Sequence, residues 1–423
     1  MIMAGHANKF HKHKSKSQNR LVLFGAGMTG RGQISQLAFE AGWNLTLIDK
    51  NARLVDRLRD AGHYTVRLLG TINREVDIRG YQAFHTSETE SIFEAINQAD
   101  LVVTSVLEPN LHDVAAILAP ALINRITSGN KREVNIISAE NMGDSTSHLR
   151  NYVSSHLPEN LCQDILMYVG FPNSMISRVV PISDDPLYII TEEYSEWTAD
   201  RYAVVGQPPR LAGLEWVENQ PARLCRKLFI HNTGHMICGI LGWLGNYRYI
   251  HEAAQNPDIM AHIKGAIDES GEAVITEYGF DRLEVKQYEE HLLGRLIISA
   301  LADDIRRVIR HPARKLGKEE RLIGPLQLCE KHDLPRVELC YGIAAVLAGS
   351  FIPYGFHEYD NQADDIRKTL EKVGPIPTLY QLVGYQPNPI SSKLIINAYA
   401  NISSQYIVPS AQDPDKLPHQ GIK

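Results

Sequence analysis

The chain has few cysteines, no long apolar run and no excess of basic charge. Its five cysteines are scattered among 423 residues without a C-x-x-C pair. This usage is typical of reduced thiols in a cytoplasmic protein and argues against a disulfide framework or a zinc ribbon. No run of about 18 apolar residues occurs, so we expect no transmembrane helix and no membrane partner. The formal net charge of −6 gives no reason to expect nucleic-acid binding.

The two ends of the chain lack the patterns of folded elements. Residues 1–20 are basic, carry no acidic residue and lack the apolar segment of a secretory signal, so we expect a disordered basic extension. Residues 409–423 are polar and contain prolines, which indicates a tail. The length between them is too great for one ordinary core and predicts two domains, residues 21–205 and 206–408.

Short apolar runs alternate with helical patterns in the first of these domains. The helical patterns cover residues 88–98 and 111–126. Apolar runs, which predict strands buried on both faces of a parallel sheet, lie at 21–24, 43–49, 101–106 and 134–139. The alternation predicts an α/β fold with a doubly wound, Rossmann-type parallel sheet. The β-rich stretch at 167–197 is expected to extend that sheet.

The pattern changes after Pro221, where strand signals become rare. Long helical patterns follow at 221–244, 256–278, 284–310, 318–332 and 335–348. An all-helical C-terminal domain is therefore predicted.

The first apolar run leads into a G-x-G-x-x-G motif. A strand precedes this motif and a helix follows it, which is the context of a dinucleotide-binding fingerprint. The expected contacts to the cofactor come from Gly25, Gly27, Met28, Thr29 and Gly30. Asp49 ends the second strand, where a carboxylate accepts hydrogen bonds from ribose hydroxyls and repels a 2′-phosphate. This favours NAD as the cofactor, although Lys50 makes a strict preference over NADP less certain. The alternative is a glycine-rich turn with an ordinary capping aspartate.

Glu140 and Asn141 follow the strand expected at 134–139. Ligands bind beyond the carboxyl ends of the strands in such sheets, so Asn141 is placed to donate a hydrogen bond to a substrate oxygen. A turn-forming role for this asparagine is equally compatible with its position.

The stretch RKLFIHNTGH at 226–235 places polar side chains in an otherwise apolar helix. At 100° per residue, Lys227, His231 and His235 fall within about 80° of arc, and Asn232 widens the arc to about 140°. A lysine among apolar groups loses solvation of its charged form, which lowers its pKa and makes it a usable general base.

A zinc site is the rival interpretation of the two histidines. The metalloprotease pattern requires a glutamate directly after the first histidine, but this chain has Asn232 after His231. No third ligand is evident, so we expect no metal.

A basic cluster follows Asp303 and Asp304. Its members are Arg306, Arg307, Arg310, Arg314 and Lys315. The cluster is either a solvated helix face or an anion site, because guanidinium groups suit a phosphate or a carboxylate.

Together these stretches resemble the mannitol dehydrogenase family of long-chain, metal-independent polyol dehydrogenases, over nearly the whole chain. The stretches that carry the resemblance are GAGMTGRG, NIISAENM, GFPNSMISRVVP, DPLYIITEEYSEW, RKLFIHNTGH, KGAIDESGEAVI and DDIRRVIRHPARKL. The family signature is a lysine followed at i+5 by asparagine and at i+8 by histidine.

The resemblance implies a role for each residue of that signature. Lys227 would be the general base, Asn141 and Asn232 would polarise the reacting oxygen, and His235 would hold a substrate hydroxyl. Arg307 and Lys315 would bind the distal part of the substrate, with Arg310 and Arg314 nearby.

The chain departs from the family where carboxylates are usual. Ser177 precedes Arg178, and no glutamate stands just upstream of Lys227, where the chain has Leu224 and Cys225. These departures bear on the substrate and on the proton exit route of the lysine.

The resemblance implies an NAD-dependent oxidoreductase that interconverts a sugar alcohol phosphate and a ketose phosphate. Mannitol 1-phosphate and fructose 6-phosphate are the favoured pair. The alternatives are an unphosphorylated polyol or ketose, a keto-sugar acid such as fructuronate or tagaturonate, and a non-catalytic NAD-binding protein.

Overall fold

The computed structural model describes residues 19–70, 72–140, 144–181, 183–350 and 361–406. The chain divides into two compact units, with the division between Glu218 and Asn219. Among the described residues, no helix is long and apolar enough to cross a membrane. All five cysteines are free thiols.

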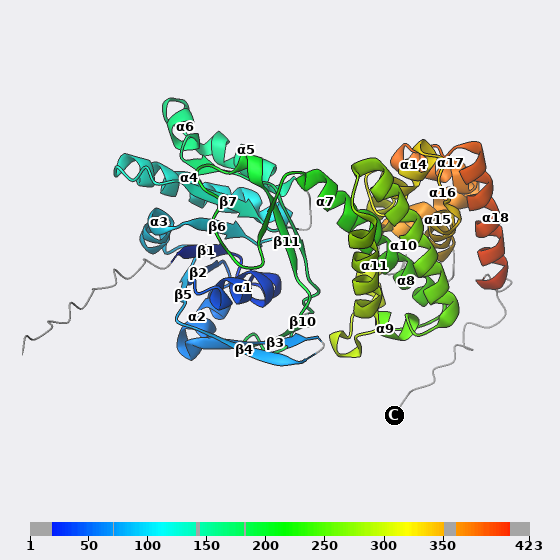
Figure 1. Cartoon of the computed structure of the whole chain (residues 1–423), viewed down its shortest axis with the longest axis horizontal. Coiled ribbons are helices and arrows are strands. Elements are labelled where there is room, and N and C mark those ends of the chain that lie inside the picture. The colour runs from blue at the N-terminus through cyan, green and yellow to red at the C-terminus, as the bar shows by residue number, and fades with distance from the viewer. Residues whose placement is uncertain (1–18, 71, 141–143, 182, 351–360, 407–423) are drawn as a thin grey trace, which may run out of the picture. The chain divides into compact units, whose positions relative to one another are not determined.

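The first unit is built on a six-stranded sheet in which every neighbouring pair of strands is parallel (Figure 1). The strand order is β5 (Gln82–His85), β2 (Asn44–Asp49), β1 (Arg20–Phe24), β6 (Leu101–Thr104), β7 (Val134–Ser138) and β8 (Val169–Gly170). The chain runs outward from β1 in both directions. This confirms the predicted doubly wound sheet.

The two faces of this sheet are covered by different helices. Alternate residues of β1 point to opposite faces, so Leu21 and Leu23 enter one core, while Val22 and Phe24 enter the other. The first core includes residues of η1 (Gly30–Ser35), α1 (Gln36–Glu40) and α2 (Ala52–Ala61). The second includes residues of α3 (Thr89–Gln98), α4 (Leu111–Thr127), α5 (Ser145–His156) and α6 (Glu159–Leu166). Burial on both faces explains the nearly continuous apolar runs of the central strands.

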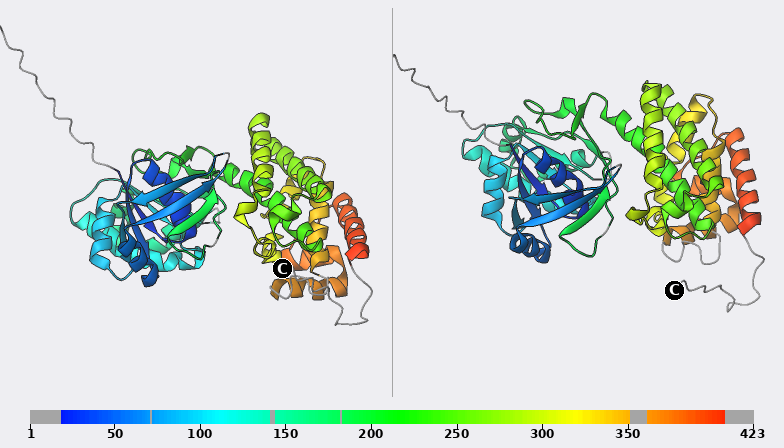
Figure 2. Two further views of the ribbon diagram at one scale, coloured as in Figure 1. Left: turned by 90° about the horizontal axis from the view of Figure 1, so that it is seen from below. Right: turned by 60° about the horizontal axis from the view of Figure 1, so that its bottom comes forward.

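The expectation that residues 167–197 extend the main sheet is correct only for β8. The other strands form two smaller sheets, which Figure 2 shows from two further directions. One has the order β10 (Tyr188–Glu192), β3 (His63–Leu69) and β4 (Arg74–Arg79), and the other has the order β12 (Glu215–Val217), β11 (Glu196–Asp200) and β9 (Ser174–Ser177). Strand β12 lies beyond residue 205, where the sequence placed the end of the α/β domain.

The second unit is helical, as the sequence predicted. Its helices are α7 (Gln220–Arg226), η4 (Lys227–His231), α8 (Asn232–Leu244), α9 (Ile250–Ala253), α10 (Pro257–Tyr278), α11 (Arg282–Leu296), η5 (Ser299–Leu301), α12 (Ile305–Ile309), α13 (Pro312–Lys315), α14 (Ile323–Lys331), α15 (Val337–Gly349), α16 (Asn361–Val373), α17 (Pro375–Val383) and α18 (Pro389–Tyr406). Helix α8 packs against α10, α12 and α15. It is buried along almost its whole length.

The single helix expected at 284–310 is wrong. Helix α11 ends at Leu296, and α12 begins at Ile305. Between them Ala302 adopts a left-handed conformation with φ of 43°, and Asp304 caps α12 by accepting a hydrogen bond from the Arg306 N–H. Helix α11 thus ends before Ala302 is reached, the left-handed Ala302 ends the short helix η5, and the Asp304 cap starts α12.

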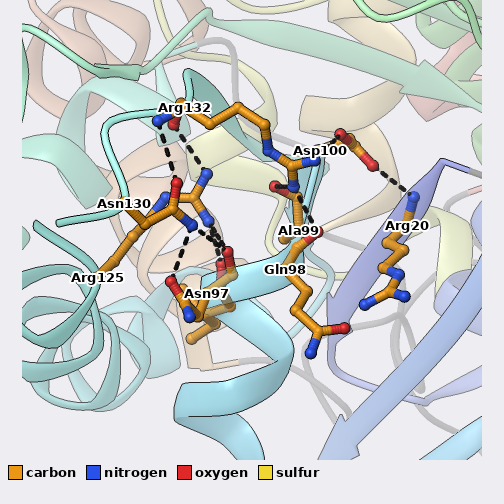
Figure 3. A network of polar contacts seen from close by, with 9 residues as sticks. Arg20, Asn97, Gln98, Ala99, Asp100, Arg125, Asn130 and Arg132 are labelled. Atoms are coloured by element: carbon orange, nitrogen blue, oxygen red, sulfur yellow. Dashed lines mark hydrogen bonds and ion pairs between the residues drawn. The ribbon is translucent and has the colours of Figure 1, made fainter. Parts of the chain in front are cut away.

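A buried arginine fixes the edge of the first unit opposite the glycine-rich turn. Figure 3 shows the Arg125 and Arg132 side chains donating to carbonyl groups at the end of α3. Arg125 Nη1 lies 2.8 Å from the Ile96 oxygen, and its Nη2 lies 2.8 Å from the Arg132 oxygen. The Ile96 oxygen lies in the last turn of α3, where it also accepts the Ala99 N–H over 3.2 Å and carries the negative end of the helix dipole. Arg125 is fully buried, and its burial lowers its pKa to about 10.

Replacing Arg125 with methionine should lower the free energy of unfolding by about 2–4 kcal/mol, because buried carbonyls lose charged donors. Urea unfolding followed by circular dichroism measures this change. Arg150→Met, on the exposed side of α5, is the matched control and should change stability by less than about 0.5 kcal/mol. Equal stability of the two variants would contradict the structural role of Arg125.

Candidate active site

The glycine-rich turn lies at the carboxyl edge of the main sheet, between β2 and β6. The Gly25 N–H donates to the Ile48 oxygen over 2.8 Å, and the Ser105 N–H donates to the Phe24 oxygen over 2.7 Å. In the sheet, β2 lies on one side of β1 and β6 lies on the other, so the strand order reverses at β1. This is the topological switch point at which open α/β sheets bind ligands.

The three glycines of the motif differ in what surrounds them. Gly25 has a φ of 91°, and a Cβ there would clash with the Ser105 backbone oxygen. A Cβ on Gly30 would clash with the Gly25 oxygen, because the helix packs tightly against the turn. At Gly27 nothing lies within 4 Å of the Cβ position. A tight turn, an open approach and a close packing contact are what a dinucleotide pyrophosphate needs from these three positions, so the residues present fit NAD.

The other predicted cofactor residues lie around this turn. Thr29 precedes η1, whose N-terminus follows the turn directly. Met28 packs against the core that contains Leu21 and Leu23, and its sulfur lies 3.8 Å from Arg31 Nη2. Asp49 ends β2 beside the turn, where one oxygen accepts the Asn51 N–H over 2.8 Å. Lys50 Nζ donates to Asn110 Oδ1 over 2.6 Å, so it is engaged by a neutral partner on η2 (Glu108–Asn110).

A buried glutamate holds the loop that follows β6. The Glu140 carboxylate accepts the N–H groups of Val106 and Leu107 over 2.7 and 3.0 Å. Burial raises the pKa of Glu140, and these two hydrogen bonds oppose the rise. Asn141, the next residue and a predicted catalytic donor, lies outside the described residues.

The helix that carries the family signature contains a π-helical turn at Lys227–His231. The Asn232 N–H donates to the Lys227 oxygen, which is an i+5 hydrogen bond. One turn of this kind spans five residues, so Asn232 lies above Lys227 on the same face. The 100° per residue of a regular α-helix predicts that these two residues lie about 140° apart, which is wrong for this turn. Helix α8 then returns to α-helical spacing, and His235 follows Asn232 by three residues.

Lys227 and Asn232 are both buried, with 5% and 6% of their surfaces exposed. Within the described part of the chain, the Asn232 Nδ2 atom is buried without a hydrogen-bond partner. A buried amide donor of this kind costs free energy unless a ligand completes its hydrogen bonding. The geometry therefore leaves one donor available on the lysine-bearing face of the helix.

His235 is held by a carboxylate from the break between α11 and α12. Its Nε2 atom lies 3.0 Å from Asp303 Oδ2. Burial lowers the pKa of His235, and the Asp303 carboxylate partly opposes this effect. The ring is therefore neutral at pH 7, and because an ionised carboxylate only accepts hydrogen bonds, we infer that Nε2 carries the proton and Nδ1 is an acceptor.

His231, the other histidine of the suspected zinc pair, has a different environment. Its Nδ1 atom lies 3.3 Å from Arg295 Nη1 on α11. Burial and the positive charge of Arg295 both lower the pKa of His231. The centres of the His231 and His235 rings are 5.9 Å apart. Over the described ranges, no group of three or more His, Cys, Asp or Glu side chains could hold a metal ion.

Three arginines of the basic cluster are paired with carboxylates. Arg306 pairs with Asp304, and Arg314 pairs with Glu320. Arg307 donates to Asp303 Oδ1 through Nε over 2.8 Å and through Nη2 over 2.6 Å. The cluster is thus neither a uniformly solvated face nor a group of free cations.

Arg310 and Lys315 are the remaining members. Within the described residues, the Arg310 side chain makes no hydrogen bond or ion pair, and the residue is exposed. Lys315 is buried, with its Nζ donating to the Val308 oxygen. Burial and the surrounding charges of Arg321, Arg314, Arg310 and Arg307 lower the pKa of Lys315 to about 6. Among the described residues, Arg310 is therefore the member of this cluster whose charge no carboxylate neutralises.

The sequence did not predict a role for three residues that contact these sites. Glu140 was noted only for its position, and Arg295 lies in an unremarkable helical pattern. Asp303 was noted only as preceding the basic cluster. The one available signal was the pair of acidic residues at 303–304, which does not reveal which of them turns inward.

The chain matches two family models. The Mannitol dehydrogenase Rossmann domain matches residues 19–213, and the Mannitol dehydrogenase C-terminal domain matches residues 223–366.

One relative and two solved structures align with most of this chain. A Brevibacillus brevis protein described as mannitol-1-phosphate 5-dehydrogenase is 35% identical over 365 residues, which is 86% of this chain and 93% of that protein. A ternary complex of Pseudomonas fluorescens mannitol 2-dehydrogenase with NAD and D-mannitol has a TM-score of 0.70 at 16% identity, covering 92% of both chains. A substrate-free D-sorbitol dehydrogenase has a TM-score of 0.76 at 14% identity, covering 92% of this chain and 94% of that one.

Gly27→Ala should fold normally but bind NADH weakly. The added methyl group meets no protein atom, so the free energy of unfolding should stay within about 1 kcal/mol of the original value. The same methyl group occupies the approach path of the pyrophosphate and should raise the Kd for NADH about tenfold or more. Fluorescence titration with NADH and thermal unfolding measure the two effects. Unchanged NADH affinity would exclude this turn as the pyrophosphate site.

Proposed function

Because the chain belongs to the mannitol dehydrogenase family and is an NAD-dependent oxidoreductase of CH–OH groups in polyols, we propose that it interconverts mannitol 1-phosphate and fructose 6-phosphate. The family predicted from the sequence motifs is thereby confirmed. The first unit would hold NAD on its glycine-rich turn, and the helical unit would supply the groups that act on the substrate. The phosphorylated substrate and the roles of single residues are our proposal.

Lys227 is assigned as the general base of polyol oxidation. A buried amine in its neutral form can accept the hydroxyl proton as the C–H bond breaks. When bound, NAD supplies the acceptor for the hydride. In the reverse direction Lys227, in its ammonium form, returns the proton to the carbonyl oxygen.

Asn232 is assigned as a donor to the reacting oxygen. The observation that supports this role is its buried Nδ2 atom, which lacks a partner among the described residues and lies on the helix face of Lys227. A neutral amide stabilises a developing alkoxide without exchanging its own proton. Asn141 is proposed as the second donor, and His235 as the acceptor for a neighbouring substrate hydroxyl through Nδ1.

The basic cluster supports an anionic substrate. Arg310 has an exposed guanidinium group without a partner in the described chain, and Arg307 and Lys315 complete the proposed anion-binding set. A phosphate dianion among these groups would raise the pKa of Lys315 from about 6 and restore its charge. The 35% identical relative carries the name of an enzyme for a phosphorylated hexitol, which supports the same choice.

Lys227→Met should lower kcat for fructose 6-phosphate reduction by about 10²- to 10⁴-fold, because the general acid and base is lost. Methionine fills a similar buried volume, so thermal stability and the Kd for NADH should stay close to their original values. Steady-state NADH oxidation and fluorescence titration give these quantities. Lys264→Met, on the exposed side of α10, is the matched control. Near-normal turnover by Lys227→Met would end the assignment.

Arg310→Gln should raise the KM for fructose 6-phosphate about 10- to 100-fold, because a hydrogen bond between charged groups is removed. Arg306→Gln is the matched control, since Arg306 is already paired with Asp304. The original chain is assayed with fructose 6-phosphate, fructose, fructuronate and tagaturonate, using NADH and NADPH. A higher kcat/KM for fructose or for a keto acid would overturn the phosphorylated substrate. NADH binding without turnover of any of these compounds would favour a non-catalytic protein.

A further inference from the structure

We propose that Asp303 is a positioning residue, which fixes the imidazole of His235 with one carboxylate oxygen and the guanidinium of Arg307 with the other. This inference rests on the proposed function, in which His235 and Arg307 contact the substrate. The distances are 3.0 Å from Oδ2 to His235 Nε2, and 2.8 and 2.6 Å from Oδ1 to Arg307 Nε and Nη2. One carboxylate thus sets the positions of two groups assigned to substrate binding.

The backbone around Asp303 is held on both sides. The Ile250 N–H donates to the backbone oxygen of Asp303 over 3.0 Å, and the Ile305 N–H donates to the backbone oxygen of Arg248 over 3.0 Å. The segment at 248–250 follows α8, the helix that carries His235. These two bonds fix the backbone at Asp303, and the bonds to His235 and Arg307 fix its carboxylate. A carboxylate held in this way can keep the His235 ring in one orientation.

Asp303 remains an acceptor throughout the working pH range. Burial alone would raise its pKa, but the hydrogen bonds and charges of His235 and Arg307 outweigh burial and lower the pKa to about 2. An ionised carboxylate accepts hydrogen bonds only, so the His235 proton must lie on Nε2. The Nδ1 lone pair is then left to accept a hydrogen bond from a substrate hydroxyl.

The neighbouring Asp304 provides the contrast. Its carboxylate caps α12 and pairs with the exposed Arg306. Two adjacent aspartates therefore have different roles, one toward His235 and one toward a helix end. The same substitution at each position separates positioning from a general loss of negative charge.

Asp303→Asn should lower kcat/KM about 10- to 100-fold, as expected when the partner of a substrate-binding group is lost. The assay uses NADH and the ketose or keto acid that gives the highest kcat/KM in the substrate panel. Asp304→Asn should leave kcat/KM close to its original value. The Kd for NADH should be unchanged in both variants.

The decisive comparison is a double-mutant cycle with His235→Ala and Arg307→Ala. If Asp303 acts through its two partners, Asp303→Asn should have no further effect in a chain that lacks both. A full additional loss in that background would assign Asp303 a separate structural role and overturn the inference. If His235→Ala and Arg307→Ala leave kcat/KM unchanged, the proposed function of these residues fails. If they lower it while Asp303→Asn does not, only the present inference fails.

A second measurement needs no Asp303 variant and so does not depend on its folding. Long-range proton–nitrogen NMR spectra of the ¹⁵N-histidine-labelled chain report which ring nitrogen carries the proton. The His235 signal is identified by its absence from His235→Gln. Protonation on Nε2 alone at pH 7.5 is the expected result. Protonation on Nδ1 would overturn the inference.

Discussion

The hydrogen bond from the Asn232 N–H to the Lys227 oxygen determines how the helical unit presents its polar groups. An i+5 bond adds one residue to the turn, so a lysine and an asparagine five positions apart share a face. Helix α8 then resumes ordinary spacing and places His235 one turn further along, opposite Asp303. The spacing of the signature and the π turn are therefore two descriptions of one backbone feature. A regular α-helix would direct Asn232 well away from Lys227.

Burial of these groups sets their charges. Burial lowers the pKa values of His231 and His235 and keeps both rings neutral, although the Asp303 carboxylate partly opposes this effect at His235. Lys315 is pushed towards neutrality by the same cause. Asp303 keeps its charge, because Arg307 and His235 compensate for its lost solvation. An anion beside Lys315 would offset the charges of Arg307 and Arg310 that now oppose its protonation.

The main features of the fold were readable because they rest on burial. The strands at the centre of the sheet are apolar on both faces, and the glycine motif is fixed by sterics that the structure reproduces at Gly25 and Gly30. Strand β4 was missed because its exposed positions carry Arg74 and Glu75. The π turn could not be predicted, since periodicity analysis assumes one fixed angle per residue. The left-handed conformation of Ala302 could not be predicted either, because alanine rarely adopts it.

The interruption between α11 and α12 explains why the two aspartates in it diverge. In sequence they are equivalent members of one polar run, and a continuous helix would set them about 100° apart. The stretch between α11 and α12, which includes Ala302, instead pairs with the segment after α8 through the bridge between Tyr249 and Asp304. This pairing turns Asp303 towards His235 and leaves Asp304 to cap α12. The helix wrongly predicted at 284–310 and the unpredicted role of Asp303 therefore have one physical cause. The interruption of the helix is what places the Asp303 carboxylate beside His235.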